Sequence, residues 1–196
     1  MLDNLKNYNI ILASYSPRRK ELLEGLGIDF EVRTVKGVRE DYPADLPLLD
    51  IAQYISAEKA AAYKEGMGKN DLLITADTIV IVGKQVIGKP KNKADACRML
   101  RLLRDKTHQV VTGVCLTTKT LQRKFSVMTD VTFGPLDDEE IDAYVERFSP
   151  LDKAGAYGIQ EWIGFIGVRE ISGSYYNVMG LPVQRIYQEL KAFPSK

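Results

Sequence analysis

Short apolar runs alternate with amphipathic segments along the chain, and this alternation predicts strands and helices in turn. The strand-like runs are 10–13, 30–35, 72–82, 86–87, 109–117 and 124–133. Helical spacing of apolar residues marks 17–27, 45–64, 92–103, 137–148 and a last segment that begins at Pro182. Asn92 is placed to cap the third of these helices, and Asp137 with Glu140 predicts a capping box at the fourth. The inward faces predicted for these two helices are Ala96, Met99, Leu100 and Leu103, and Ile141, Tyr144, Val145 and Phe148. Because the helices fall between strands without repeats or low-complexity linkers, we expect a compact α/β fold, and no domain boundary is visible over 1–196.

The segment from Ser14 to Arg19 carries the strongest local signal for ligand binding. It follows an apolar run, and Ser16 is placed to cap a helix that has Pro17 as its first residue. The free amides and the dipole at such a helix start attract anions. The guanidinium groups of Arg18 and Arg19 can each bind a phosphate through two hydrogen bonds. The alternative is an ordinary helix cap followed by two solvated arginines.

Charge and composition narrow the functional classes. The 27 lysines and arginines nearly balance the 26 aspartates and glutamates, so no overall field draws the chain to nucleic acid. Cys97 and Cys115 are far apart and His108 is the only histidine, which argues against a zinc or haem centre. The chain shows no signal-peptide pattern and no run of about 18 apolar residues. We therefore expect a cytoplasmic protein with no membrane partner.

Two charged residues break the local apolar pattern. Asp77 interrupts the run 72–82, where an unpaired carboxylate is costly to bury. Either the strand turns or ends there with a hydrogen-bonded aspartate, or the carboxylate binds Mg²⁺ or activates water. Lys59 lies on an apolar helical face, so its ammonium either extends outward to solvent or reaches toward phosphate. The other members of this predicted face are Ala52, Ile55 and Ala62.

Later loops offer further polar groups. Lys89 lies in a tight glycine–proline turn, and Lys153 and Gln160 lie in a glycine-rich segment where a ligand can approach the backbone. The segment 172–182 is expected to be a polar, aromatic loop that enters the last helix. Packing alone can also account for these glycines. The chain lacks the P-loop, Rossmann and nucleophile-elbow signatures, so its phosphate chemistry must be of another kind.

Taken in order, these segments resemble the Maf family of nucleoside triphosphate pyrophosphatases over essentially the whole chain. The matching blocks are Leu12 to Arg19, Glu58-Lys59-Ala60, Ala76-Asp77-Thr78, Gly88-Lys89-Pro90, Asp152 to Gln160 and Gly180-Leu181-Pro182. The resemblance implies a mixed α/β fold like that of the inosine triphosphatase superfamily, in a single domain over 1–196. A twisted mixed sheet with flanking helices would form two lobes around a nucleotide cleft. It also implies hydrolysis of a nucleoside triphosphate to the monophosphate and pyrophosphate, assisted by a divalent cation.

The resemblance further implies a role for each site residue. Asp77 would be the proton acceptor, and Asp77 with Glu40 would hold Mg²⁺ or Mn²⁺. The match at Glu40 is imperfect, because Arg39 stands where the family usually has an aspartate. Arg19, rather than Arg18, is the expected phosphate ligand among the two arginines. The full set of implied phosphate-binding residues is Ser14, Ser16, Arg19, Lys59 and Lys89.

Three positions distinguish substrate subgroups in the family. Arg18, Thr78 and Gln160 match the branch that acts on dTTP and UTP, whereas the branch acting on 7-methyl-GTP carries an aromatic residue, glutamine and glutamate there. An amide such as Gln160 both donates and accepts, which suits the mixed edge of uracil, thymine or a modified pyrimidine. The family also implies a homodimer. The alternatives are a non-catalytic nucleotide-sensing regulator of septum formation or cell division, and a phosphatase that releases orthophosphate.

Overall fold

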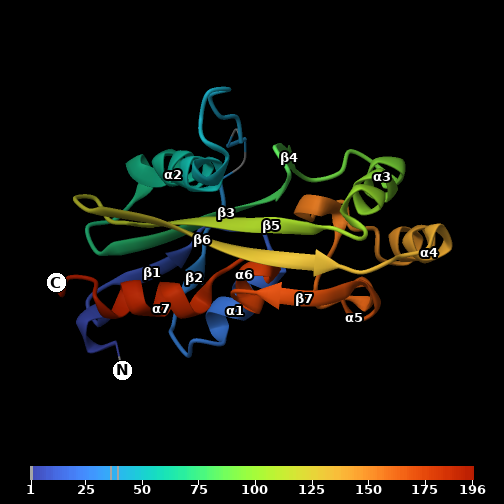
Figure 1. Cartoon of the computed structure of the whole chain (residues 1–196). Helices are drawn as coiled ribbons and strands as arrows, with labels where there is room; N and C mark the ends of the chain where they lie inside the picture. Colours follow the sequence, from blue (N-terminus) through green and yellow to red (C-terminus); the bar gives the residue numbers. More distant parts are fainter. Residues whose placement is uncertain (1, 36, 39) are drawn as a thin grey trace. The chain divides into compact units, whose positions relative to one another are not determined.

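Figure 1 shows the computed structural model of the chain, which describes residues 2–35, 37–38 and 40–196. Arg39, singled out by the sequence, lies outside the described residues. The chain divides into two compact units, each described by itself. The first comprises Met1–Asp77, Thr112–Val127 and Gly180–Lys196, and the second comprises Thr78–Val111 and Met128–Met179. No helix among the described residues combines the length and the apolar character needed to cross a membrane.

The secondary structure is a mixed α/β arrangement, as the sequence predicts. The strands are β1 (Asn9–Leu12), β2 (Glu31–Val32), β3 (Asp71–Val82), β4 (Gln85–Ile87), β5 (Thr107–Thr117), β6 (Gln122–Phe133) and β7 (Val168–Ser172). The α-helices are α1 (Pro17–Glu24), α2 (Ile51–Tyr63), α3 (Lys93–Leu103), α4 (Asp138–Phe148), α5 (Trp162–Gly167), α6 (Tyr175–Met179) and α7 (Val183–Lys191). Short 3₁₀ turns cover Asp3–Leu5, Leu48–Asp50, Lys64–Gly66 and Ala154–Ala156. The strands join in the order β2-β1-β3-β5-β6-β7, with β4 paired to β3.

In the first unit, parallel strands carry a buried core. Strand β1 runs parallel to both β2 and β3, and its pairing with β3 extends from Asn9 opposite Asp71 to Leu12 opposite Ile74. Helix α2 lies on one side of these strands, and α1 and α7 lie on the other (Figure 1). A buried apolar cluster lies between α2 and the strands, because both faces of a parallel sheet are covered. Its members are Ile11, Ala13, Ala60, Tyr63, Met67, Leu73 and Cys115.

Gly113 of β5 sets how closely α2 lies on the sheet. A Cβ atom at this position would lie 2.2 Å from the backbone nitrogen of Gln53 and 2.3 Å from the carbonyl carbon of Ala52. Real Cβ atoms do not approach backbone so closely. The backbone of α2 therefore rests directly on β5, a contact that only a residue without a side chain permits.

In the second unit, helices α3 and α4 bury the faces that the sequence predicts. Four residues of α3 and three of α4 join the core, while Phe148 packs against it partly exposed. The seven core residues are Ala96, Met99, Leu100, Leu103, Ile141, Tyr144 and Val145. The turn at Gly83, with φ of 59°, connects the antiparallel strands β3 and β4, and β7 pairs antiparallel with β6.

Helix starts are the most accurate predictions from sequence. The Ser16 hydroxyl accepts the backbone N–H of Arg19 at 3.4 Å, and Pro17 is the first residue of α1. Asn92 caps α3 in the same way, accepting the N–H of Asp95 at 2.9 Å. The predicted capping box at the start of α4 is also present, with the N–H of Asp137 donating to Glu140 at 2.8 Å. These starts depend only on neighbours within three residues, so local sequence is enough to place them.

Other boundaries differ from the prediction. The strand expected over 30–35 is only Glu31–Val32, and the helix expected over 45–64 begins at Ile51 after a 3₁₀ turn. Pro47 has an extended ψ of 138°, so the chain enters that turn from an extended conformation. The segment 172–182, expected as a loop, contains α6, and β7 precedes it. Both elements are only five residues long, so they give a periodicity search little signal. In α5, which precedes them, Gly164 permits a close backbone approach, because a Cβ there would lie 1.8 Å from the carbonyl oxygen of Ile159.

Candidate functional site

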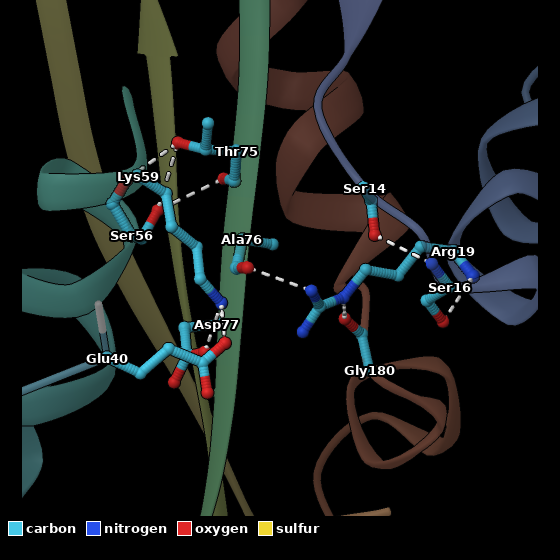
Figure 2. A network of polar contacts seen from close by, with 10 residues as sticks. All are labelled: Ser14, Ser16, Arg19, Glu40, Ser56, Lys59, Thr75, Ala76, Asp77 and Gly180. Atoms are coloured by element: carbon cyan, nitrogen blue, oxygen red, sulfur yellow. Dashed lines mark hydrogen bonds and ion pairs between the residues drawn. The ribbon is translucent and has the colours of Figure 1, made fainter. Parts of the chain in front are cut away.

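One lysine and two carboxylates form the charged centre of the first unit. The Lys59 ammonium lies 2.7 Å from Oδ1 of Asp77 and 2.7 Å from Oε1 of Glu40 (Figure 2). The side chains of Lys59 and Asp77 are only 16% and 10% exposed, whereas that of Glu40 is 44% exposed. We call these three residues the Lys59 centre. The aspartate that breaks the apolar strand is therefore stabilised by a cation, as a buried carboxylate requires.

The position of Lys59 argues against one of the two alternatives that the sequence left open, an ammonium that extends to solvent. Its ammonium does not extend to solvent but turns toward the carboxylates of β3 and the segment before α2. The predicted inward face is partly wrong, because Ala62 is exposed. The buried residues of α2 are Ile51, Ala52, Ile55, Ser56, Ala60 and Tyr63, so Lys59 lies at the edge of the inward face. A residue at an edge can bury its stem and still bring its charge to a polar site.

The predicted anion site at the start of α1 lies close to Asp77 in the same unit. The Ser14 hydroxyl accepts the N–H of Ser16 at 3.1 Å, which shapes the turn into the helix. Arg19 donates from Nη1 to the carbonyl of Ala76 at 2.8 Å and from Nε to the carbonyl of Gly180 at 2.8 Å. Figure 2 shows Arg19 and the Lys59 centre on opposite sides of the β3 ribbon.

The electrostatic environment of Arg19 links it to the same charges. Burial lowers the pKa of its guanidinium, and the negative charges of Asp77 and Glu40 act in the opposite direction. Arginine has so high an ordinary pKa that the group stays cationic. Arg19 therefore places a fixed positive charge at the backbone carbonyl of Ala76, the residue before Asp77.

The remaining predicted site residues are distributed over both units. Arg18 is half-buried on α1 of the first unit. In the second unit, Thr78 is half-buried on β3 and Lys89 is exposed in the turn after β4. The carbonyl of Gly88 beside Lys89 accepts the N–H of Gly155 at 3.0 Å. This hydrogen bond ties the lysine-bearing turn to the glycine-rich segment that leads to Gln160.

Gln160 carries a buried polar atom that the protein leaves unsatisfied. Among the described residues, its side-chain oxygen Oε1 has no hydrogen-bond partner although it is inaccessible to solvent. Such atoms are rare in folded proteins, because each one forfeits the hydrogen bond it would make to water. The amide oxygen of Gln160 therefore keeps an unused acceptor, which a ligand donor would reach only after the side chain moves out of its present position.

Lys153 has a different environment from the one the sequence suggested. We expected it to offer polar reach to a ligand, but its buried ammonium lies 2.8 Å from Asp152 and 3.1 Å from Glu161. Tyr144 donates its hydroxyl to Glu161 and accepts the N–H of Gly158 at 3.0 Å. Burial and the negative charge of Glu161 raise the pKa of Tyr144, which keeps it a donor. We call Lys153, Asp152, Glu161 and Tyr144 the Lys153 network.

Two hydroxyl residues beside the Lys59 centre were not among the site residues predicted from the sequence. Ser56 of α2 and Thr75 of β3 are both fully buried and hydrogen-bonded to each other. Two local signals mark them in retrospect. Ser56 is a polar residue on the buried face of α2, and Thr75 lies on the same strand face as Asp77.

The Lys59 centre has the donor chemistry for a divalent cation. Mg²⁺ and Mn²⁺ prefer carboxylate oxygens, and Asp77 and Glu40 already share one positive group, the Lys59 ammonium. Within the described ranges, no cluster of three or more histidine, cysteine, aspartate or glutamate side chains could hold a metal by itself. Two carboxylates fit the common Mg²⁺ arrangement in which substrate phosphates and water supply the other ligands.

Comparison with known proteins assigns the chain to a family. The family model described as "Maf-like protein" matches residues 9–193. A Phocaeicola vulgatus protein named "dTTP/UTP pyrophosphatase" is 63% identical over 97% of this chain and 99% of its own length. Proteins with the same name from Bacteroides thetaiotaomicron and Flavobacterium johnsoniae are 59% and 46% identical, over 97% and 96% of this chain and 99% and 96% of their own. The chain belongs to the Maf-like protein family.

Proposed function

We propose that the protein hydrolyses dTTP and UTP to the nucleoside monophosphate and pyrophosphate. The relatives described above carry this activity in their names at up to 63% identity over nearly the full chain. The observation that carries the proposal is the Lys59 centre. In this centre, the nearly buried carboxylate of Asp77 and the carboxylate of Glu40 each lie 2.7 Å from the Lys59 ammonium. General-base chemistry next to a phosphate-binding cation needs this combination.

Different residues of the first unit would bind the phosphates and activate the attacking water. The amides after Ser16, with Arg19 and Lys59, would bind and neutralise the phosphates. Lys59 would exchange its carboxylate partners for phosphate oxygens, which releases Asp77. Asp77 would then accept a proton from water as the water oxygen bonds to the α-phosphorus. The bond from the α-phosphorus to the bridging oxygen breaks, and pyrophosphate leaves with its charge paired.

A divalent cation fits this arrangement and would be held by Asp77 and Glu40 together with substrate oxygens. When bound, it would neutralise charge on the phosphates and promote ionisation of the attacking water. The exchange of partners by Lys59 is necessary for this, because its ammonium lies against both carboxylates. Asp77 and Glu40 would then have a cation beside them in both states of the site.

The base would be recognised in part by Gln160. Once the side chain turns toward the base, its Oε1 would accept the N3–H of uracil or thymine, and its amide nitrogen would donate to a carbonyl of the same edge. Modified pyrimidines that keep this edge would also bind. The specificity roles of Arg18 and Thr78 and the phosphate-binding role of Lys89 remain predictions, as do the homodimer and the cytoplasmic location.

A product analysis tests the proposal. The purified chain is incubated with dTTP, UTP, dCTP, GTP or 7-methyl-GTP and Mg²⁺ or Mn²⁺, and the products are separated by anion-exchange chromatography. We expect dTMP and UMP with one pyrophosphate each, and slow turnover of the other nucleotides. Release of orthophosphate with a nucleoside diphosphate would overturn the reaction type, and a preference for guanine nucleotides would overturn the specificity. Nucleotide binding without turnover would favour the regulator.

A further inference from the structure

Two pairs of side chains connect α2 to β3, and one of them is buried out of reach of any ligand. The outer pair is Lys59 with Asp77, at 2.7 Å. The inner pair is Ser56 with Thr75, and both residues have no exposed surface. Figure 2 shows both pairs on the same side of the β3 ribbon. Ser56 precedes Lys59 by three residues on α2, and Thr75 precedes Asp77 by two residues on β3.

The inner pair is reciprocal. Thr75 Oγ1 donates to the backbone carbonyl of Ser56 at 2.8 Å, and Ser56 Oγ donates to the backbone carbonyl of Thr75 at 3.1 Å. The two hydroxyl oxygens are 3.3 Å apart. Each side chain thus binds the main chain of the other element. Such a contact fixes the position of the two backbones, which a contact between two flexible side-chain ends would not do.

The spacing of the two pairs transmits this position to the catalytic groups. Residues three apart on a helix share a face and are separated by about 4.5 Å along its axis. Residues two apart on a strand also share a face and are separated by about 6.6 Å. A slip of β3 by one residue would turn Thr75 and Asp77 to the opposite face together. The register that satisfies Ser56 and Thr75 is therefore the register that brings Lys59 to Asp77.

Gly113 and Cys115 of β5 contribute to the packing of α2 on the sheet around the inner pair. Gly113 allows the α2 backbone at Gln53, one turn before Ser56, to rest on the strand. Cys115 is fully buried in the cluster between α2 and the strands, and burial raises the pKa of its thiol. It therefore remains a neutral neighbour of the two hydroxyls. The carboxylate of Asp77 is then the charged group that β3 presents to α2 at this point.

We infer that Ser56 and Thr75 are positioning residues for the reaction, because their reciprocal hydrogen bonds set α2 on β3 so that Lys59 meets Asp77. This inference rests on the proposed function. It predicts that the hydroxyl of Thr75 influences turnover without touching substrate. Small errors in the placement of catalytic groups reduce rates strongly, since the productive geometry is occupied less often.

The test compares Thr75→Val, which keeps the shape and removes the hydroxyl, with Thr75→Ser, which keeps the hydroxyl. Thr117→Val is the matched control, because Thr117 is a buried strand threonine of the same unit whose hydroxyl accepts from Gln122 at 3.0 Å. We expect kcat for dTTP to fall about 10-fold in Thr75→Val. It should recover in Thr75→Ser and stay near the native value in Thr117→Val.

Two further measurements separate positioning from loss of stability. In a Lys59→Met background, Thr75→Val should cause no further loss of kcat, because its effect passes through Lys59. Equal losses of kcat in both backgrounds, or equal effects of Thr75→Val and Thr117→Val, would overturn the inference. A crystal structure of Thr75→Val gives a readout independent of activity. We expect the Lys59–Asp77 distance to exceed its native 2.7 Å, and an unchanged distance would also overturn the inference. If the native chain releases no pyrophosphate, the proposed function fails, while the crystallographic test still decides the positioning role.

Discussion

Lys59 and Lys153 each share two carboxylates among the described residues, and they differ in what holds those carboxylates. Lys153 pairs with its neighbour in sequence, Asp152, and with Glu161, which Tyr144 also binds. Tyr144 in turn accepts a backbone N–H, so the network ends in the main chain of its own loop. Lys59 instead joins three separate segments, namely α2, β3 and the segment that carries Glu40.

Under the proposed function, this difference distinguishes a structural network from a reactive one. The Lys153 network joins neighbouring residues of the segment 152–161 to Tyr144 of α4. The Lys59 centre brings two carboxylates from distant parts of the chain against one cation, and its outer carboxylate is 44% exposed. A cation in that position can be replaced by another one. Buried charge pairs are common in both roles, so the experiments below measure stability and turnover side by side.

The largest expected effect is that of Asp77→Asn on turnover. The amide keeps the shape but cannot accept a proton, so kcat for dTTP should fall by about 10² or more. The thermal midpoint should change little, because Lys59 keeps its contact with Glu40. Steady-state kinetics and thermal unfolding of the same preparation check both statements. Near-native turnover in this variant would contradict the role of Asp77.

Lys59→Met should reduce kcat/KM by about 10²-fold, because the phosphates lose a preorganised cation. The same variant should bind Mn²⁺ more tightly than the native chain when no nucleotide is present. The reason is that Asp77 and Glu40 repel each other once the ammonium between them is gone, and a metal relieves that repulsion. Electron paramagnetic resonance of free Mn²⁺ measures the affinity. Weaker Mn²⁺ binding than in the native chain would show that Lys59 does not compete with metal.

Lys153→Met should act mainly on stability. It leaves Glu161 with a charge that has lost its cation in a mostly buried site, so the free energy of unfolding should fall by about 1–3 kcal/mol. Urea unfolding at pH 7 measures this. The double variant Lys153→Met/Glu161→Gln should recover part of the loss, because the uncompensated charge is gone. A Lys153→Met protein with native stability would remove the distinction between the two lysines.

The pH must be controlled in that comparison, because the second unit also contains a buried histidine. Burial lowers the pKa of His108 to about 4, and its Nε2 lies 2.7 Å from the hydroxyl of Tyr157. The unfolded chain, with a histidine pKa near 6.5, therefore binds the proton first as pH falls. His108 contributes stability above pH 6.5 that is lost toward pH 4.

The free energy of unfolding, measured in urea, should accordingly be about 2 kcal/mol lower at pH 5 than at pH 7 because of His108. His108→Gln cannot take up the proton, so the dependence on pH should be flatter in that variant. An identical pH slope in the native and variant chains would exclude His108 as its cause.

The smallest expected effect is that of Lys93→Met. Lys93 lies 2.7 Å from Glu146, but both side chains are largely exposed, at 46% and 76%. Exposed ion pairs contribute little, so the free energy of unfolding should change by less than about 0.5 kcal/mol and kcat should not change. The same two assays check this third lysine pair. A loss comparable to that of Lys153→Met would mean that burial is not what makes the Lys153 network strong.

Features that depend on near neighbours could be read from the chain. The caps at Ser16, Asn92 and Asp137 are correct because each is completed within three residues. Asp77 could be singled out because a carboxylate conflicts with the apolar strand around it, and such conflicts mark functional sites. The order of motif blocks was sufficient to indicate the family, which the comparisons establish independently.

Features that depend on partners far along the chain could not be predicted from the sequence. The pattern left Lys59 undecided between solvent and cleft, and only the fold brings its ammonium to Asp77, 18 residues away. The ion pairs of Lys153 could not be predicted for the same reason, since its burial depends on Glu161 and the core around Tyr144. Gly113 gave no sign of its role, because the backbone it accommodates belongs to α2, some 60 residues earlier.

The amino-acid sequence by itself determined the α/β pattern, the starts of α1, α3 and α4, and the set of residues able to do phosphate chemistry. Local hydrogen bonding and apolar periodicity suffice for these. Only the tertiary structure decided which charges meet, because ion pairs and reciprocal hydroxyl contacts require elements to be brought together by packing. The contrast between Lys59 and Lys153 is the clearest case. Both are lysines near carboxylates, and their roles differ through the elements that hold those carboxylates.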